Sequence, residues 1–137
     1  GPIATIEHAE VRFDKLCGHW KKYGFGPWKL IEKRSEEVMG YGGLNFMHYG
    51  ETLRLNLGYR LDEAYWGNGY ATEVAQIALN YGLKKLDQKA IFGLVRPNHI
   101  ASIRVLEKCG MILYDKLDDF PGLEKSLIYR FLKEEKK

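Results

Sequence analysis

A glycine-bearing turn directly before a helical pattern is the part of this sequence with the clearest chemistry. The turn carries Gly67 and Gly69, and Ala71 begins a run of apolar residues at helical spacing. Small residues let the main chain come close to a ligand, and the first turn of a helix offers unpaired N–H groups and the positive end of the helix dipole. The pattern therefore predicts an anion site on residues 66–72 that needs no lysine.

Other interpretations of this turn make different demands on the sequence. A plain loop leading into a helix needs no ligand and is the simplest alternative. A dinucleotide-binding turn has the wider Gly-x-Gly-x-x-Gly spacing, and a P-loop ends in Gly-Lys-Ser or Gly-Lys-Thr. Residues 58–73, with the sequence GYRLDEAYWGNGYATE, contain neither pattern.

The turn lies between the two most regular patterns in the chain. Residues 53–61 alternate with a period of two, so that four leucines and Tyr59 share one face while Arg54, Asn56 and Arg60 share the other. Residues 71–86 place apolar side chains along one side of a helix. A strand, a turn and a helix are therefore expected to position the anion site.

The N-terminal half predicts three further elements. An amphipathic helix is expected over residues 5–23, and an antiparallel hairpin over residues 28–33 and 38–46, joined by a charged turn at Ser35 and Glu36. The apolar positions at helical spacing in the first segment are Ile6, Ala9, Phe13, Leu16, Cys17 and Trp20.

The C-terminal part predicts a buried strand at residues 89–95, a short helix at 102–108 and two closing strands at 111–117 and 125–133. Gly110 is expected to end the short helix. The element order predicts an α/β fold of the mixed α+β kind, in which helices cover a mixed sheet. No repeat or linker divides the chain, so a single domain over residues 1–137 is expected.

Two segments in this order resemble a known family. Residues 58–73, and residues 96–111 with the sequence RPNHIASIRVLEKCGM, are similar to two motifs of the GNAT superfamily of acetyl-CoA-dependent N-acetyltransferases. Within it they resemble the ribosomal-protein N-terminal acetyltransferase (RimJ/RimL-like) branch. Trp28 with residues 39–44, MGYGGL, is a weaker third likeness. The resemblance covers nearly the whole chain.

This resemblance implies the GNAT fold, a mostly antiparallel mixed sheet with a splayed parallel strand pair, flanked by helices. The co-substrate acetyl-CoA (coenzyme A) would place its diphosphate on the turn and its pantetheine arm between residues 59–63 and 92–95, against exposed main chain. A main-chain N–H near Leu61 would polarise the thioester carbonyl. The coenzyme-binding residues implied are Leu61, Trp66, Gly67, Asn68, Gly69, Tyr70, Ala71, Thr72, Asn98, His99 and Ser102.

The same resemblance implies two catalytic residues. Many members carry a tyrosine as the acid where Leu106 stands here, and Ser102 matches a serine to which the branch assigns that role. Glu63 matches the proposed base of the branch. Each has a simpler alternative, since a serine in the first turn of a helix is a preferred cap and Glu63 could be a solvated loop carboxylate.

The sequence departs from the family at two places. The branch commonly has asparagine where His99 stands, with Asn98 beside it, so His99 is expected either to donate to pantetheine or to be an exposed loop histidine. The family's opening strand and helix are not expected here, so the domain is expected to be N-terminally shortened. A homodimer is then one expected arrangement.

Composition excludes several other classes. A formal charge of +3, with basic and acidic residues interspersed, argues against nucleic acid as a partner. The sequence predicts no metal site, no membrane span and no secretory signal, so a cytoplasmic location is expected. Cys17 and Cys109 are expected to be reduced.

Three functions remain open at this stage. The first is an acetyltransferase that acts on a primary amine, either a protein N-terminus or a small molecule. The second is a catalytically inactive acyl-CoA-binding regulatory module, and the third is a structural protein that keeps only the fold. The sequence does not identify the acceptor, because fold analogy is a poor guide to substrate.

Overall fold

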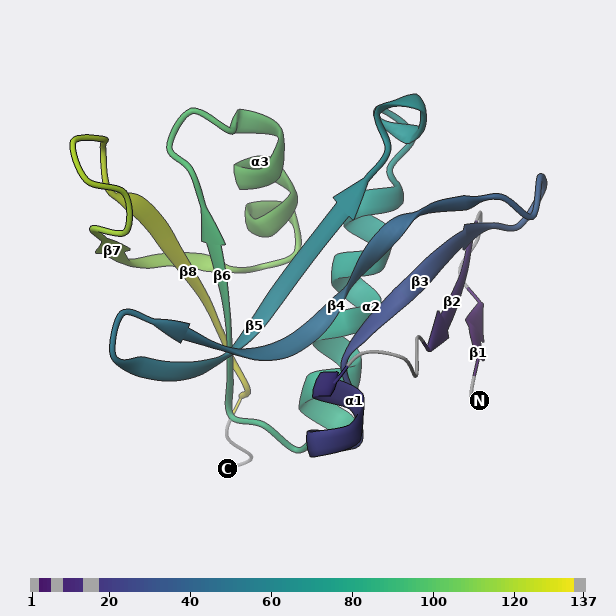
Figure 1. The fold of residues 1–137 in the computed structure, drawn as a ribbon, viewed down its shortest axis with the longest axis horizontal. Helices are drawn as coiled ribbons and strands as arrows, with labels where there is room; N and C mark the ends of the chain where they lie inside the picture. The colour runs from purple at the N-terminus through teal and green to yellow at the C-terminus, as the bar shows by residue number, and fades with distance from the viewer. Residues whose placement is uncertain (1–2, 6–8, 14–17, 135–137) are drawn as a thin grey trace.

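One sheet, in the order β1-β2-β3-β4-β5-β6-β8-β7, organises the chain (Figure 1). The structure is a computed structural model that describes residues 3–5, 9–13 and 18–134. The strands are β1 (Ile3–Thr5), β2 (Ala9–Phe13), β3 (Pro27–Glu32), β4 (Val38–Tyr49), β5 (Thr52–Leu61), β6 (Ala90–Val95), β7 (Ile112–Leu117) and β8 (Ser126–Leu132). The helices are α1 (Gly18–Tyr23), the short 3-10 helix η1 (Glu63–Tyr65), α2 (Tyr70–Lys84) and α3 (Ile100–Lys108).

The predicted helix over residues 5–23 is wrong for half of its described length, namely Thr5 and Ala9–Phe13. Ile3–Thr5 and Ala9–Phe13 form antiparallel strands, and β2 continues the sheet beyond β3. Ala9–Phe13 also alternates apolar and charged residues, so pairing with β3 outweighs the helical spacing. Two strands therefore precede α1 where the sequence predicted none. Ile6, Leu16 and Cys17 lie outside the described residues.

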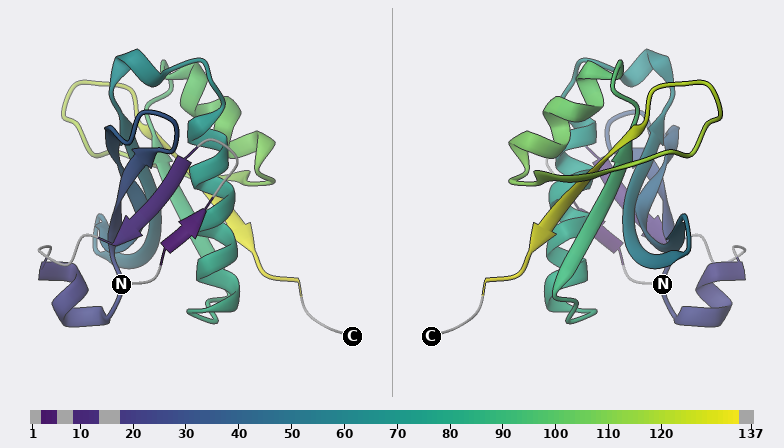
Figure 2. Two further views of the ribbon diagram at one scale, coloured as in Figure 1. Left: turned by 90° about the vertical axis from the view of Figure 1, so that its right-hand side faces the viewer. Right: turned by 90° about the vertical axis from the view of Figure 1, so that its left-hand side faces the viewer.

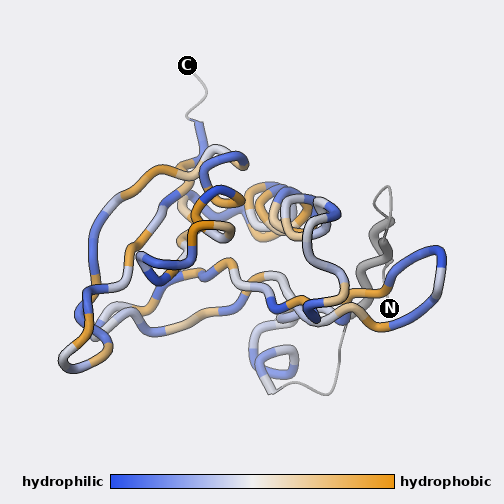
Figure 3. Tube along the Cα trace, turned by 90° about the horizontal axis from the view of Figure 1, so that it is seen from above, coloured by the Kyte–Doolittle hydropathy of each residue, from blue (hydrophilic) through white to orange (hydrophobic). Residues whose placement is uncertain are grey.

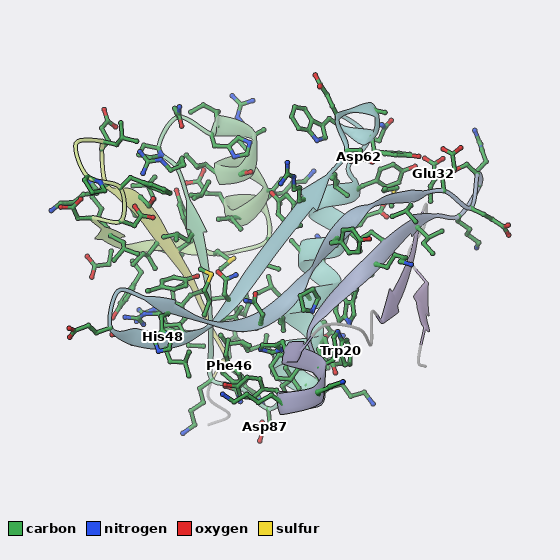
Figure 4. The ribbon with its side chains drawn as sticks, viewed as in Figure 1. Trp20, Glu32, Phe46, His48, Asp62 and Asp87 are labelled. Carbon is green, nitrogen blue, oxygen red and sulfur yellow. The ribbon has the colours of Figure 1, made fainter. Side chains whose placement is uncertain are left out.

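The last part of that predicted helix is confirmed as α1. Ring contacts and hydrogen bonds of His19 and Trp20 hold α1 against the sheet. Trp20 Nε1 donates to the Pro27 carbonyl at 2.8 Å. His19 Nε2 accepts the main-chain N–H of Phe46 at 2.8 Å, and its other ring nitrogen lies 2.7 Å from the Phe25 carbonyl oxygen. Trp20 and Phe46 are labelled at this junction in Figure 4.

The central hairpins are as the sequence predicted. β3 pairs with β4, and β4 pairs with β5 from Gly40 opposite Leu61 to Tyr49 opposite Thr52, all antiparallel. In β5 the residues Leu55, Leu57 and Leu61 are buried, as the period-two pattern predicts.

Helix α2 covers the sheet with the side that the spacing predicted. Val74, Ala75 and Ala78 are fully buried against the strands, and Leu79 nearly so. A Cβ at Gly82 would come within 2.8 Å of both Ile91 and Leu44, so a glycine there allows the close approach of helix and sheet. Figure 2 shows α2 and α3 on one face of the sheet and α1 on the other.

The parallel pair β5 and β6 meets at one point and then separates. The parallel register places Asn56 opposite Phe92, and beyond it the two strands diverge toward the upper edge in Figure 1. Asn56 is buried there, where it accepts from the Tyr49 hydroxyl and donates to Asn45 Oδ1. Its polar groups are thereby satisfied at the start of the divergence.

Helix α3 follows β6 and ends as predicted. Gly110 has φ +89°, its N–H donates to the Glu107 carbonyl, and the N–H of Met111 donates to the Leu106 carbonyl. These two bonds form a Schellman motif, in which glycine is the favoured residue. The closing strands β7 and β8 pair antiparallel, and β8 pairs with β6.

Candidate active site

The predicted anion-binding turn joins η1 to α2. Gly67 and Gly69 have φ +80° and +78°, a left-handed conformation that non-glycine residues adopt at a cost, and a Cβ at either position would meet no atom within 4 Å. Asn68 Nδ2 donates to the carbonyls of Tyr65 and Trp66, both at 3.2 Å. These bonds hold the turn in an open loop with free space above the glycines.

The start of α2 has no side-chain cap. Gly69 is the N-cap residue and offers no side-chain acceptor, while its main-chain carbonyl accepts the N–H of Glu73 at 3.1 Å. The N–H groups of Ala71 and Thr72 precede that first bond, and the first amides of a helix lack partners within it. This end of the helix can therefore receive an anion on its main chain.

Trp66 connects the turn to the end of β5. Its indole Nε1 donates to the Leu61 carbonyl at 2.9 Å, while 61% of its surface stays exposed. The resemblance implied that Trp66 binds the coenzyme, and no spacing in the sequence indicated this bond to Leu61. The bond sets the distance between the turn and the strand that precedes it.

The main chain of Leu61 faces the gap between β5 and β6. Leu61 lies opposite Gly40, and the next N–H along the strand, that of Asp62, donates to the Met39 carbonyl at 2.7 Å. Hydrogen-bonding directions alternate along an antiparallel strand, so the N–H of Leu61 points away from β4. It points toward the side on which β6 has diverged.

Ser102 lies across this gap, in the first turn of α3. The helix begins at Ile100 with His99 as its N-cap residue, so Ser102 is not the cap, contrary to the simpler alternative. Its Oγ lies 3.5 Å from the Tyr59 hydroxyl and 3.5 Å from His99 Nε2. Tyr59 of β5 and His99, the N-cap residue of α3, therefore both approach the Ser102 hydroxyl.

Tyr59 is the residue that sequence reasoning missed. The period-two pattern assigned it correctly to the leucine face of β5, where it was grouped with the core. Burial raises the pKa of the Tyr59 hydroxyl, and the bond to Ser102 opposes that rise. A tyrosine among leucines on a buried face was the available signal, since a buried phenol needs a polar partner.

Other predicted site residues lie at the rim. Glu63 is exposed in η1, and the described residues offer its carboxylate no hydrogen bond. Asn98 is exposed in the loop before α3, whereas Thr72 is half-buried and its carbonyl lies 3.8 Å from Cys109 Sγ. Leu106, at the position where the resemblance would place a tyrosine acid, is buried in the core.

A polar hollow of about 800 Å³ adjoins the turn on the β3–β4 side. The Tyr70 hydroxyl donates to Glu32 at 2.7 Å and the Tyr65 hydroxyl to Glu37 at 2.9 Å, so both carboxylates are bound by neutral donors. Figure 3 shows the hydrophilic β3–β4 turn at this side, and Figure 4 labels Glu32 there. The lining residues are Glu32, Lys33, Arg34, Glu37, Ala64, Tyr65, Asn68 and Tyr70.

Metal-ligand clusters and membrane-spanning helices are both absent from residues 3–5, 9–13 and 18–134. No group of three His, Cys, Asp or Glu side chains in this part of the chain is arranged to hold a metal ion. No helix within it is both long and apolar enough to cross a bilayer. Cys109 is a free thiol whose pKa is raised by burial.

Known proteins with related sequences point to one family. The acetyltransferase (GNAT) domain matches residues 2–112. Uncharacterized protein YkkB of Bacillus subtilis is 36% identical over 91 residues, covering 66% of this chain and 53% of that protein. Uncharacterized N-acetyltransferase p20 of Bacillus licheniformis is 31% identical over 101 residues, covering 74% and 56%. The chain thus spans about half the length of these relatives.

Solved structures agree on the fold. A GnaT-family acetyltransferase from Bordetella pertussis superposes with a TM-score of 0.82 at 17% identity, covering 95% of this chain and 99% of that chain. The ribosomal-protein-S5-alanine acetyltransferase of Vibrio fischeri gives 0.78 at 13% identity, covering 96% and 97%. A RimL acetyltransferase in complex with coenzyme A gives 0.74 at 14% identity, covering 96% and 98%.

Proposed function

Because the chain belongs to the acetyltransferase (GNAT) domain family, we propose that it transfers the acetyl group of acetyl-CoA to a primary amine. The observation that carries this proposal is the open turn at Gly67 and Gly69, whose following helix starts with uncapped amides beside two diverging strands. Within the family we assign the chain to the RimJ/RimL-like branch, on the motifs at residues 58–73 and 96–111.

The residues present fit coenzyme A in two places. Amides of residues 67–72 can bind the diphosphate, since helix N-termini bind such anions through the dipole and free N–H groups. Main-chain groups of Tyr59 and Leu61 on the gap side of β5 can pair with the amides of pantetheine, as in the addition of a strand to a sheet. Trp66, Asn98 and His99 lie at the rim of the same region.

The proposed chemistry is direct attack of a neutral amine on the thioester carbonyl, after which the carbon–sulfur bond breaks and the electron pair leaves on sulfur. The N–H of Leu61 faces the gap in which the developing oxyanion would form, the position required of an oxyanion donor. Ser102 donates its hydroxyl proton toward the leaving sulfur. Glu63 accepts the amine proton through water, since its exposed carboxylate can reach solvent.

An α-amino group is the acceptor that this site suits best. Its reference pKa of about 7.7–8.0 leaves much of it neutral near physiological pH, whereas a lysine side chain at about 10.4 needs a strong base. No buried carboxylate or histidine of the described residues lies in the gap as a strong base. The acceptor is therefore proposed to be a protein N-terminus or a small-molecule amine of similarly low pKa.

The test combines thiol release with binding. Acetyl-CoA is incubated with the protein and a panel of peptides and small amines, and free thiol is measured with wild type and Ser102→Ala. Thiol release that requires an amine and falls by about 10² or more in the variant supports the proposal. Tight coenzyme binding without turnover for any amine would favour the regulatory module instead, and absence of binding would favour a structural protein.

A further inference from the structure

The gap between β5 and α3 is bridged by three polar side chains, of which only two were expected to take part in chemistry. Ser102 Oγ lies between the Tyr59 hydroxyl and His99 Nε2, at 3.5 Å from each. Tyr59 lies three positions beyond Asn56, where the parallel register with β6 is observed, so it belongs to the diverging part of the strand. Its hydroxyl reaches across the opening to the helix that follows β6.

We propose that Tyr59 is a positioning residue for Ser102: its hydroxyl donates to Ser102 Oγ and leaves the single proton of that serine directed at the coenzyme sulfur. This inference rests on the proposed function, because it concerns the acid of that reaction. Leu106 offers no hydroxyl from α3, so the proposed acid is Ser102 and Tyr59 acts only through it.

Hydroxyl chemistry supports this assignment. A serine hydroxyl has one proton and two acceptor lone pairs. When the Tyr59 hydroxyl donates to one lone pair, the Ser102 proton no longer points toward Tyr59 and can point toward the sulfur. Burial raises the pKa of Tyr59, so its hydroxyl stays protonated and able to donate at neutral pH. The separations of 3.5 Å are long, and hydrogen bonds in such sites shorten when the substrate complex forms.

The packing around Tyr59 fixes the direction of its side chain. A Cβ at Gly42 would lie 2.8 Å from Tyr59 Cβ and 3.2 Å from Val74, so the absence of a side chain at Gly42 leaves room for the tyrosine between β4 and α2. Among the described residues, the titratable groups beside this network are His99, which contacts Ser102, and Cys109, whose thiolate form raises the pKa of Tyr59.

The proton balance of the proposed step is simple. As the carbon–sulfur bond breaks, the Ser102 proton passes to sulfur and the serine oxygen becomes the stronger acceptor. The Tyr59 hydroxyl bond to that oxygen then strengthens, because bonds to a charged acceptor are about twice as strong as neutral ones. Solvent returns the proton to Ser102 after the thiol leaves.

The experiment measures the pKa of the coenzyme A thiol while it is bound, from the ultraviolet absorbance of the thiolate as pH is varied. The variants are Tyr59→Phe, Ser102→Ala and the double variant, with Ser102→Thr as the conservative change and Tyr41→Phe as control. Tyr41 is an exposed tyrosine of β4. A hydroxyl that donates to the thiolate lowers the thiol pKa, so no amine acceptor is needed for this readout.

The expected results form a double-mutant cycle. Ser102→Ala raises the bound thiol pKa by about one pH unit, and Tyr59→Phe raises it by roughly half of that. The thiol pKa in the double variant is no higher than in Ser102→Ala alone, since Tyr59 acts through the serine. Ser102→Thr keeps the low thiol pKa, and adding Tyr59→Phe to Ser102→Thr raises that pKa as it does in the wild-type background. Tyr41→Phe leaves the thiol pKa unchanged.

Each other outcome contradicts a defined part of the account. A normal effect of Ser102→Ala with no effect of Tyr59→Phe overturns the inference and leaves the proposed function standing. Additive effects of the two substitutions also overturn it, since Tyr59 would then act independently. If wild-type protein does not bind coenzyme A, the proposed function fails and the inference fails with it.

Discussion

The indole N–H of Trp66 donates to the Leu61 carbonyl at 2.9 Å, so the last residue of β5 and the first residue of the turn are held together. In the proposed site Leu61 presents the oxyanion donor and the turn binds the diphosphate. This side-chain bond, together with the main-chain bonds of η1, therefore holds the oxyanion donor and the diphosphate-binding turn at a fixed separation.

Trp66→Phe is expected to weaken coenzyme A binding roughly 3- to 10-fold, because a neutral hydrogen bond contributes about 0.5–1.5 kcal/mol. Calorimetric titration measures the change. Trp20→Phe is the matched control, since it removes another indole bond, to the Pro27 carbonyl, at α1. An equal loss of affinity in both variants would contradict the role given to Trp66.

Gly69→Ala should impair coenzyme binding beyond its effect on stability. An alanine at φ +78° is strained by about 1–2 kcal/mol, although its Cβ meets no atom within 4 Å. Gly122 also has φ +78° and open space, but lies in the β7–β8 loop. Gly122→Ala should therefore lose similar stability in urea unfolding and keep its affinity, whereas Gly69→Ala should lose at least about 10-fold in affinity as its amides are redirected.

The bond between Tyr70 and Glu32 predicts how stability depends on pH. It lowers the pKa of Glu32 below the ordinary 4.5 and, as the main cause, raises the pKa of Tyr70 from 10.0 to about 12. The Glu32 contribution is present above pH 4.5 and is lost as pH falls through its lowered pKa. The Tyr70 contribution is present below pH 10 and is lost as pH rises through about 12.

Tyr70→Phe should therefore lower the melting temperature by a constant amount in the neutral range. The difference from wild type should shrink at both acidic and strongly alkaline pH. Thermal unfolding followed by circular dichroism tests this, with the exposed Tyr41→Phe as control. A difference that grows on acidification would show that the bond does not act through the Glu32 carboxylate.

Ser126 anchors the loop between β7 and β8 and should be sensitive to truncation. It is 1% exposed, donates to Asp119 at 2.8 Å and accepts from Arg96 at 3.0 Å. Ser126→Ala leaves both partners less satisfied, so it should cost about 1–3 kcal/mol of unfolding free energy. Ser35→Ala, at an exposed turn, should cost far less in the same urea titration. Equal costs would show that the buried network is not stabilising.

The sequence predicted the parts of the fold whose local pattern and tertiary packing agree. The α2 face at Val74 and Ala78, the leucine face of β5 and the cap at Gly110 are all of this kind. Residues 9–13 carry both a helical and a strand pattern, and pairing with β3 decides between them. No local signal contains that pairing, so the helix prediction was wrong there.

The site shows the same division. The turn at Gly67 and Gly69 could be predicted because positions with a left-handed backbone conformation favour glycine, which is visible in the sequence. The contact of Tyr59 with Ser102 joins residues that are 43 positions apart, and the Trp66 bond depends on a rotamer. Both arise from tertiary geometry that no spacing in the sequence records. The roles of Glu63 and Asn98 stay predictions, since neither side chain meets a partner among the described residues.

The most direct test of the central claim follows the main-chain amides themselves. Isotope-labelled protein is titrated with coenzyme A, and amide signals are recorded by heteronuclear NMR. The account predicts that the amides of residues 67–72 show the largest shifts, that Leu61 and Ser102 shift as well, and that pantetheine without phosphates leaves the turn unshifted. Saturable binding of coenzyme A that leaves the amides of Gly67, Gly69 and Ala71 unchanged would contradict it.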